Sequence, residues 1–390
     1  MNICIISQRY PYKDNMEFVF VKKIVDEWAK DGHRCVVITT MPWATYFRGH
    51  IKYKPSYYRY EVAAGNYVEV YNPRYINTGF NIAGVALDQW MAAGVIEKQL
   101  IRLKIKFDFI YCHFFCSGLK GFRYAKTYKI PFFIATGESE IEPLLKPFPR
   151  FRWEDFRLYT NGVISVSSKN KTEAAKLGYI DEAKCQVFPN GTDIRLFKPL
   201  CKAECRNKLG LPQNTFIVSC VGFICERKGQ NRLLEAVRRL SIKNIKLMFI
   251  GATAPVESFP LEGDEILFKG PVENKSLPDY LCASDIFCLP TRAEGCCNAI
   301  IEALACGLPV ISSNKPFNWD VLDESNSILI NPDSSKAISD AIIQLYNDAE
   351  KCKELSEGAL RMAKSLDIHQ RAENILSFIV EHTCCNHEKA

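Results

Sequence analysis

The chain has 390 residues and a net charge of +6, and 47% of its residues are hydrophobic while 24% are charged. This length exceeds one ordinary core and favours two domains. No run of 18 apolar residues occurs, so the composition excludes a membrane-spanning helix. The 17 cysteines include no C-x-x-C pair, which argues against a disulfide framework and a zinc site.

The first half of the chain alternates apolar runs with helical periodicity. Residues 18–30 are amphipathic and predict a helix. Short apolar runs predict buried strands at Asn2–Ser7, Arg34–Thr40, Asp108–His113, Pro131–Thr136 and Gly162–Ser167. No charged leader precedes the opening strand, so we expect no secretory signal and a cytoplasmic protein.

Two stretches of this half combine aromatic with basic residues. They are WATYFRGHIKYKPSYYRY (43–60) and LLKPFPRFRWEDFR (144–157), and we expect both to form loops. Their composition suits a membrane interface, a lipid-pyrophosphate acceptor or a sugar-stacking surface. Surface loops that pack their own aromatic rings are the other interpretation.

The pattern restarts after residue 200. Its strands are expected at Phe216–Gly222, Lys246–Gly251, Ile266–Lys269, Ile286–Leu289 and Pro309–Ser313, with a helix at Arg232–Leu240. Strands that alternate with helices predict parallel sheets covered by helices. We therefore predict an α/β protein of two doubly wound, Rossmann-like domains facing a cleft, divided near Phe197–Ala203.

Charge is unevenly shared between the halves. Residues 1–199 carry 29 Lys and Arg against 19 Asp and Glu, whereas residues 200–390 carry 21 against 25. A basic first half suggests an anionic partner, either an anionic membrane surface or a phosphate-bearing acceptor. No helix-turn-helix, RNA-recognition or zinc-finger pattern occurs, so we do not expect nucleic acid.

The segment VGFICERKGQ (221–230) carries two cations at a strand-to-helix turn. Arg227 and Lys228 stand just before the expected helix, where positive charge and unpaired amides together favour an anion. A solvated basic loop is the other interpretation of these two residues.

The segment LPTRAEGCCNAIIEALACGLP (289–309) carries two carboxylates eight positions apart, Glu294 and Glu302. That spacing is roughly two helical turns. Gly295 lets a ligand approach the backbone, beside unpaired amides at a helix start. Such a site suits a ligand with hydroxyls and phosphate, such as a nucleotide sugar. Solvated helix positions are the alternative, and Cys296 and Cys297 are interpreted as small filler.

Other candidate residues lie at strand ends and turns. Asn190 begins a turn in VFPNGTDIRLFKP (187–199). His113 ends a strand, at the edge where such sheets bind ligands. Glu138 follows the next strand, and the glycine-free loop Gln8–Glu17 has Asn15 to supply its turn.

Together these motifs resemble the retaining GT-B glycosyltransferases of family 4. The resemblance rests on the E-x7-E segment with its Pro, Gly and Asn residues, on the R-K-G loop, and on the P-N-G-x-D segment. It implies an acceptor-binding domain at 1–199 and a nucleotide-sugar-binding domain at 200–368. It also implies that a final helix, residues 369–386, packs back on the first domain.

The resemblance assigns donor binding to the second domain. Arg227 and Lys228 neutralise the leaving diphosphate, Glu302 holds the ribose, and Glu294 holds the hydroxyls of the sugar. The full donor set is Gly222, Phe223, Arg227, Lys228, Glu294, Gly295, Cys296, Cys297, Asn298 and Glu302. Many family members have Arg where this chain has Phe223.

The acceptor side departs from the family pattern. Gly137 stands where many members have a histidine, and Glu138 is the substitute candidate. Glu138 could stabilise charge at the anomeric carbon, hold an acceptor hydroxyl, or cap a helix. His113, Asn190 and Asn15 complete the expected acceptor side or cleft floor.

The implied function is hexosyl transfer from a nucleotide-diphosphate sugar to a glycan or lipid-linked acceptor in surface polysaccharide biosynthesis. No metal or other cofactor is expected, and contact with the inner face of an anionic membrane would be peripheral. Two alternatives remain: a catalytically silent nucleotide-sugar or glycan-binding protein, and a GT-B epimerase or sugar-phosphate synthase. A dinucleotide-dependent oxidoreductase is excluded because no G-x-G-x-x-G follows either first strand.

Overall fold

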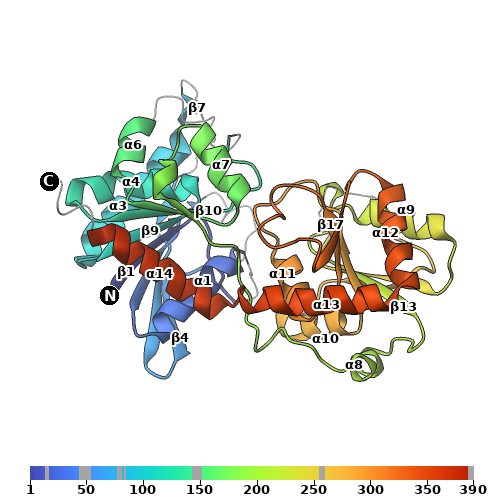
Figure 1. Ribbon diagram of the computed structural model, residues 1–390. Coiled ribbons are helices and arrows are strands. Elements are labelled where there is room, and N and C mark those ends of the chain that lie inside the picture. Colours follow the sequence, from blue (N-terminus) through green and yellow to red (C-terminus); the bar gives the residue numbers. More distant parts are fainter. Residues whose placement is uncertain are drawn as a thin grey trace. The chain divides into compact units, whose positions relative to one another are not determined.

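The computed structural model describes residues 1–13, 17–43, 54–76, 81–82, 85–142, 152–253 and 260–384. The chain separates into two compact units (Figure 1). The first contains Met1–Phe188 together with His369–Ala390, and the second contains Pro189–Ile368. The boundary expected after residue 199 lies inside the second unit.

An eight-stranded sheet forms the core of the first unit. Its spatial order is β12-β11-β10-β9-β1-β2-β5-β4, and its pairs are parallel except β4 with β5. The strands are β1 Asn2–Ser7, β2 Arg34–Ile38, β4 Tyr57–Ala63, β5 Asn66–Tyr71, β9 Phe109–His113, β10 Phe132–Thr136, β11 Gly162–Ser165 and β12 Cys185–Val187. The predicted strands of this half are confirmed. They could be predicted because a strand that is buried on both faces of a sheet is a continuous apolar run.

Helices cover both faces of this sheet. They are α1 Val19–Lys30, α3 Leu87–Leu103, α4 Phe115–Tyr128, α6 Trp153–Tyr159, α7 Ser168–Lys176 and α14 Ile368–Cys384, with a 3-10 turn at Glu182–Lys184. Short strands form two further pairs, β3 Met41–Pro42 with β6 Arg74–Tyr75 and β7 Asn81–Ile82 with β8 Val85–Ala86.

The last helix packs on the first unit, beside α1 (Figure 1). The indole N–H of Trp28 in α1 donates to the carbonyl oxygen of Ala372 at 2.9 Å. A Cβ at Gly162 would lie 2.7 Å from the ring of Phe378, so β11 and α14 are in close contact. Gly121 of α4 lies against Ile6 instead, which places α4 on the opposite face.

The expectation that the two aromatic and basic stretches are loops is wrong for part of each. Residues 57–60 begin β4, which pairs with β5 at the edge of the sheet across a turn at Gly65 with φ of 81°. Residues 153–157 lie in α6, where buried Phe156 packs against the ring of Phe122 at 5.2 Å. In both segments, contacts with the rest of the unit determine the secondary structure more than the local composition does. Residues 44–53 and 143–151 lie outside the described part of the chain.

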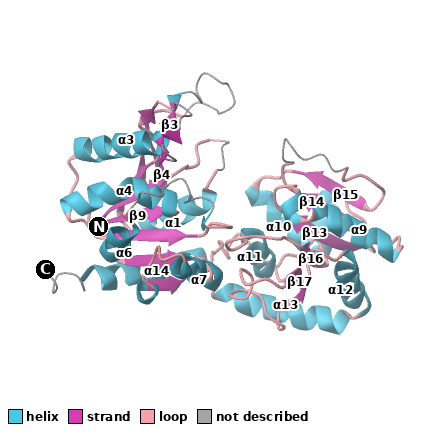
Figure 2. Ribbon diagram, turned by 90° about the horizontal axis from the view of Figure 1, so that it is seen from above, coloured by secondary structure: helices cyan, strands magenta, loops and turns pink. Residues whose placement is uncertain are grey.

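A six-stranded parallel sheet forms the core of the second unit (Figure 2), in the order β15-β14-β13-β16-β17-β18. Its strands are β13 Phe216–Val221, β14 Ile245–Ile250, β15 Ile266–Gly270, β16 Ile286–Leu289, β17 Val310–Ser313 and β18 Ser327–Ile330. The chain proceeds outward from β13 to β15 and then restarts at β16 on the other side of β13. This reversal between β13 and β16 is where open α/β sheets bind ligands.

Helices flank this second sheet as well. They are α8 Lys202–Leu209, α9 Gln230–Leu240, α10 Leu277–Cys282, α11 Asn298–Ala305, α12 Ser335–Asn347 and α13 Ala349–Lys364, with 3-10 turns at Glu226–Lys228 and Asn274–Ser276. Helix α9 contacts α12, and α11 contacts α13. Among the described residues, no helix is both long and apolar enough to span a bilayer.

Candidate functional site

Two loops meet at the strand-order reversal of the second unit. One follows β13 and carries Arg227 and Lys228, and the other follows β16 and carries Glu294. The amide of Arg292 donates to the carbonyl oxygen of Arg227 at 2.9 Å, which joins the loops through their backbones. The fold therefore brings together two motifs that lie more than sixty residues apart in the sequence.

A single carboxylate oxygen receives three hydrogen bonds at this junction. Oε1 of Glu294 lies 2.7 Å from Nζ of Lys228, 2.7 Å from Nη1 of Arg227 and 2.9 Å from Oγ1 of Thr291. Glu294 is 9% exposed and Lys228 is 8% exposed. The sequence motifs did not single out Thr291, although a hydroxyl three residues before an acid is a common local hydrogen-bond partner.

The electrostatics of this cluster keep its members charged. Burial alone would raise the pKa of Glu294, but the nearby charges of Lys228 and Arg227 lower it overall. Burial would likewise lower the pKa of Lys228, but interactions with neighbouring groups, among them the Glu294 carboxylate, raise it overall. The pair is therefore ionised at neutral pH. The Arg227 side chain remains 41% exposed, so it can reach a ligand in solution.

Glycines allow the two loops to approach this closely. Gly222, at the end of β13, has φ of +144°, and a Cβ there would lie 3.5 Å from Cε of Lys228. Gly229 has φ of +81°, and a Cβ there would lie 2.5 Å from the carbonyl oxygen of Pro290. Both φ values favour glycine. A side chain at either position would push the loops apart or disturb Lys228.

A third cation contacts both loops. The guanidinium of Arg232, in the first turn of α9, donates to the carbonyl oxygens of Pro332 at 2.7 Å and Pro290 at 2.9 Å. It also donates to Oε1 of Glu226 at 3.1 Å. Sequence patterns missed Arg232, because a basic residue on a helix is ordinarily solvated.

The other predicted donor residues follow Glu294 along the chain. Gly295, Cys296 and Cys297 are buried, and α11 begins at Asn298. Lys228 lies 3.8 Å from the Cys297 sulfur, while burial raises the pKa of that thiol and keeps it protonated. Of the two remaining predicted residues, Glu302 lies in α11 and is 7% exposed, and Phe223 follows Gly222 and is 49% exposed.

Asn190 ties the start of the second unit to the same loop. Its side-chain amide donates to the carbonyl oxygen of Cys296 at 3.0 Å, and its backbone amide donates to the Cys296 sulfur at 3.4 Å. The adjacent Gly191 is needed for packing, since a Cβ there would lie 3.0 Å from Cα of Ile368. The P-N-G segment thus positions the loop that carries Glu294.

The candidate residues of the first unit lie at the carboxyl ends of β9 and β10. His113 is 3% exposed, and its Nδ1 has no hydrogen-bond partner among the described residues. Burial, with a further effect of Arg371, lowers the pKa of His113 to about 3, so the ring is neutral. Its ring packs against Phe114 and Phe20. Asn15 lies outside the described residues.

Glu138 makes the contacts of a helix cap. Its Oε1 accepts from the amide of Phe115, the first residue of α4, at 2.9 Å. Its Oε2 accepts from Oγ1 of Thr136 at 2.6 Å and from the amide of Gly137 at 2.9 Å. Burial raises the pKa of Glu138 against the opposing effect of these hydrogen bonds. A direct contact of Glu138 with a sugar stays a prediction.

Within the described ranges, no group of three or more His, Cys, Asp and Glu side chains is arranged to hold a metal ion. The positive charge at the junction of β13 and β16 comes instead from Arg227 and Lys228. The arrangement can hold an anion at the loop cations and hydroxyls at the carboxylate.

Comparison with known families covers both units. The model for "Glycosyltransferase Family 4" matches residues 18–196. The model for "Glycosyl transferases group 1" matches residues 202–362. The two matches are consecutive and leave only short segments of the chain uncovered.

Among curated proteins, the chain is 28% identical over 365 residues to TuaC of Bacillus subtilis, named as a glycosyltransferase of teichuronic acid biosynthesis. The match covers 89% of this chain and 90% of that protein. It is 25% identical over 306 residues to an Escherichia coli enzyme, UDP-Gal:alpha-D-GlcNAc-diphosphoundecaprenol alpha-1,3-galactosyltransferase. That match covers 69% of this chain and 77% of the enzyme.

Solved structures share the whole architecture. Sucrose-phosphate synthase of Thermosynechococcus elongatus superposes with a TM-score of 0.75 at 18% identity, over 99% of this chain and 100% of that one. HepE of Anabaena, solved in complex with UDP, superposes with a TM-score of 0.74 at 17% identity, over 98% of this chain and 100% of that one. At these identities the likeness concerns the fold alone.

Proposed function

The chain belongs to glycosyltransferase family 4 and is a transferase with the GT-B fold, and from this premise we propose that it moves a hexose from a nucleoside-diphosphate donor to a glycan or lipid-linked acceptor. The anomeric configuration is retained. Support for the acceptor class comes from the names of the relatives, one of which acts on a diphosphoundecaprenol-linked sugar. Another is named for the synthesis of a surface polysaccharide.

The observation that carries this proposal is the pairing of Glu294 with Lys228 and Arg227. A donor sugar presents hydroxyls next to a diphosphate, and this cluster presents an acceptor of hydrogen bonds next to two cations. Lys228 is buried and fixed, while Arg227 is partly exposed. Fixed cations stabilise the charge that develops on the leaving diphosphate, which is the main catalytic contribution expected here. They also remove the need for a metal ion.

In the proposed reaction the bond between the anomeric carbon and the diphosphate oxygen breaks. The acceptor hydroxyl attacks that carbon from the same face, and its proton passes to the departing phosphate oxygen. Arg227 and Lys228 bind the diphosphate, and Glu294 with the amides from Gly295 to Asn298 holds the sugar. Glu302 holds the ribose hydroxyls, while Gly222 and Phe223 border the nucleotide.

In the first unit we assign His113 and Glu138 different roles. His113 is neutral, and its Nδ1 has no partner among the described residues, so it can exchange a hydrogen bond with a substrate hydroxyl. Glu138 is a positioning residue, because its oxygens fix the start of α4 directly after His113 and Phe114. Asn190 positions the donor loop. We place the enzyme at the cytoplasmic face of a membrane, which is where a lipid-linked acceptor would be met.

The proposal is tested by titrating the full chain with UDP-, GDP-, dTDP- and ADP-hexoses in a calorimeter or thermal-shift assay, followed by a transfer assay. A ligand that binds the folded state raises its melting temperature. We expect one nucleotide class to bind and to lose affinity in Lys228→Met and Glu302→Ala. Absence of binding by all four donors to folded protein would contradict the donor assignment. Binding without transfer or hydrolysis would favour the silent binding protein.

A further inference from the structure

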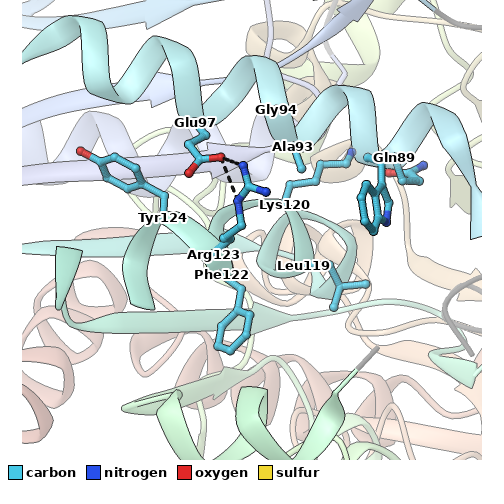
Figure 3. A pocket seen from close by; sticks show the side chains of 10 residues that line it. Gln89, Ala93, Gly94, Glu97, Leu119, Lys120, Phe122, Arg123 and Tyr124 are labelled. Atoms are coloured by element: carbon cyan, nitrogen blue, oxygen red, sulfur yellow. Dashed lines mark hydrogen bonds and ion pairs between the residues drawn. The ribbon is translucent and has the colours of Figure 1, made fainter. Parts of the chain in front are cut away.

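A pocket of about 360 Å3 lies between α3 and α4 in the first unit (Figure 3). Helix α3 contributes Trp90, Ala93 and Gly94 to its lining, and α4 contributes Leu119 and Phe122. The Trp90 side chain is 71% exposed. The pocket is therefore a largely apolar trough that opens to solvent, and it carries a tryptophan, a residue enriched at binding interfaces.

A second pocket of about 210 Å3 adjoins the first. It is lined by Gln8, which follows β1, and by Thr39 and Thr40, which follow β2. Lys120 and Gln89 line both pockets. The trough between the helices thus continues to the carboxyl edge of the sheet, where α/β folds bind their ligands.

Each of the two residues shared by the pockets has a polar atom without a partner among the described residues. Lys120 is 7% exposed, and among the described residues its ammonium has no ion pair or hydrogen bond. Burial lowers the pKa of Lys120. The Oε1 atom of Gln89 is also buried without a partner in the described part of the chain. In Figure 3 the two side chains lie at the same end of the pocket, Lys120 on α4 and Gln89 on α3. Buried polar groups normally find partners, and an unpaired buried cation is costly.

The neighbouring cations in the pocket walls, unlike Lys120, are paired with carboxylates. Arg123, one turn further along α4, forms an ion pair with Glu97 of α3, drawn dashed in Figure 3. Lys54, in the wall of the second pocket, lies 3.6 Å from Glu17 and donates to the carbonyl oxygen of Tyr10. Of these three cations, only Lys120 has no paired anion among the residues that the structure describes.

We infer that Lys120 and Gln89 bind the phosphate head of an amphiphilic acceptor whose apolar chain lies in the trough between α3 and α4. The phosphate supplies the missing anion to Lys120, and a hydroxyl of the head group donates to Oε1 of Gln89. The trough lined by Trp90 and Leu119 covers part of the alkyl chain. Naming this ligand as the acceptor rests on the proposed function, whereas the binding site itself needs no donor.

The test is calorimetric titration of the full chain with dodecyl phosphate, with dodecanol and inorganic phosphate as separate probes. Lys120→Met keeps the length of the side chain and removes its charge. Lys126→Met is the matched control, because Lys126 lies on the same helix in an exposed ion pair with Asp155. We expect dodecyl phosphate to bind the wild type and the control alike, and Lys120→Met about tenfold more weakly. Equal affinity in all three proteins would overturn the inference.

The other two probes separate the parts of the ligand. Dodecanol should bind more weakly than dodecyl phosphate and with the same affinity in wild type and Lys120→Met. If inorganic phosphate alone binds as tightly as dodecyl phosphate, the trough plays no part and the amphiphile is the wrong ligand class.

A stability measurement distinguishes this role from a structural one. Because Lys120 is buried and has no partner in the described part of the chain, Lys120→Met should raise the melting temperature while it weakens binding, a combination typical of functional sites. A fall in melting temperature would assign Lys120 to the fold instead. Binding of nucleotide sugars should be unchanged in Lys120→Met, so failure here would leave the donor assignment standing.

Discussion

Nζ of Lys228 lies 2.7 Å from Oε1 of Glu294, and both side chains are buried. The sequence motifs assign these residues to different parts of a donor, the diphosphate and the sugar. Their contact means that the two parts of the site are coupled. A diphosphate that binds Lys228 weakens the ion pair between Lys228 and Glu294, and so alters the carboxylate that holds the sugar. Loss of either residue should therefore affect both donor binding and turnover.

Removal of the buried cation should impair catalysis more than folding. In Lys228→Met we expect kcat/KM to fall on the order of 100-fold or more, since a fixed group that stabilises the leaving charge is lost. Glu294 keeps its hydrogen bonds from Arg227 and Thr291, so the fold should persist. Transfer assays with circular dichroism as a folding check measure this.

Lys336→Met is the matched control for that experiment, because Lys336 pairs with Asp340 on the exposed face of α12. Its kcat/KM should equal that of the wild type, as expected for a surface ion pair. Near-wild-type turnover in Lys228→Met would contradict the assignment of Lys228 to the leaving diphosphate.

The charge of Glu294 should stabilise the protein in a pH-dependent way. Its pKa in the folded protein lies below the ordinary value of 4.5, so its stabilisation is fully present above pH 4.5. It is lost as the pH falls through the lower folded-state pKa. Glu294→Gln leaves Lys228 buried and less well paired, which should cost about 3 kcal/mol at pH 7.

Urea unfolding of wild type and Glu294→Gln at pH 7 and at several values below 4.5 gives the comparison. The difference in the free energy of unfolding should be constant at the higher pH values and shrink in acid. Glu357→Gln, an exposed position of α13, should match the wild type throughout. A difference that grows in acid would contradict the sign of the pKa shift.

Much of the architecture could be predicted from the sequence, because the central strands are continuous apolar runs. Strands such as Asn2–Ser7 and Ile286–Leu289 are found as expected. The hairpin of β4 and β5 was missed, although its residues alternate around Gly65. A basic and aromatic composition is compatible with an exposed loop and with an edge strand alike. Residues 57–60 form a strand because β4 pairs with β5, which in turn pairs with β2.

The candidate site could be predicted as a set of residues but not as a set of contacts. Resemblance to the family's R-K-G and E-x7-E segments identifies Lys228 and Glu294, whereas their spacing alone would also fit solvated positions. That these residues pair depends on β16 lying beside β13, which is a property of the strand order. The same limit applies to Lys120, because its position in the middle of α4 carries no sequence signal that it is buried and has no partner among the described residues.

Buried His113 should make the stability of the protein depend on pH between about 5 and 7, above the range in which most carboxylates titrate. Its pKa falls from 6.5 to about 3 through burial and Arg371. Between these values the unfolded chain binds a proton that the folded protein does not, so stability is highest above pH 6.5 and decreases as the pH falls. The expected slope is about 1.4 kcal/mol per pH unit.

His113→Gln should remove this slope whatever its effect on stability at pH 7. The free energy of unfolding of both proteins is measured at pH 7, 6 and 5, and the wild type should lose stability relative to the variant at each step. Parallel pH profiles would show that the ring is protonated in the folded protein.

Glu138 should act on catalysis through the start of α4. In Glu138→Gln the new amide group faces the amide of Gly137 instead of accepting from it, and an unsatisfied buried donor results. The free energy of unfolding should fall by about 1–3 kcal/mol. The start of α4 follows His113 and Phe114 directly, so we also expect kcat/KM of the folded protein to fall on the order of tenfold.

Ser334→Ala separates this positioning effect from general destabilisation. Ser334 caps α12 in the second unit by accepting from the amide of Ala337 at 3.1 Å, and its loss should cost about 1 kcal/mol. Both variants are assayed well below their melting temperatures, so that each is fully folded. If Glu138→Gln and Ser334→Ala retain the same kcat/KM, Glu138 is a cap and nothing more. A fall confined to kcat/KM of Glu138→Gln, with donor affinity unchanged, assigns the residue to the acceptor side of the reaction.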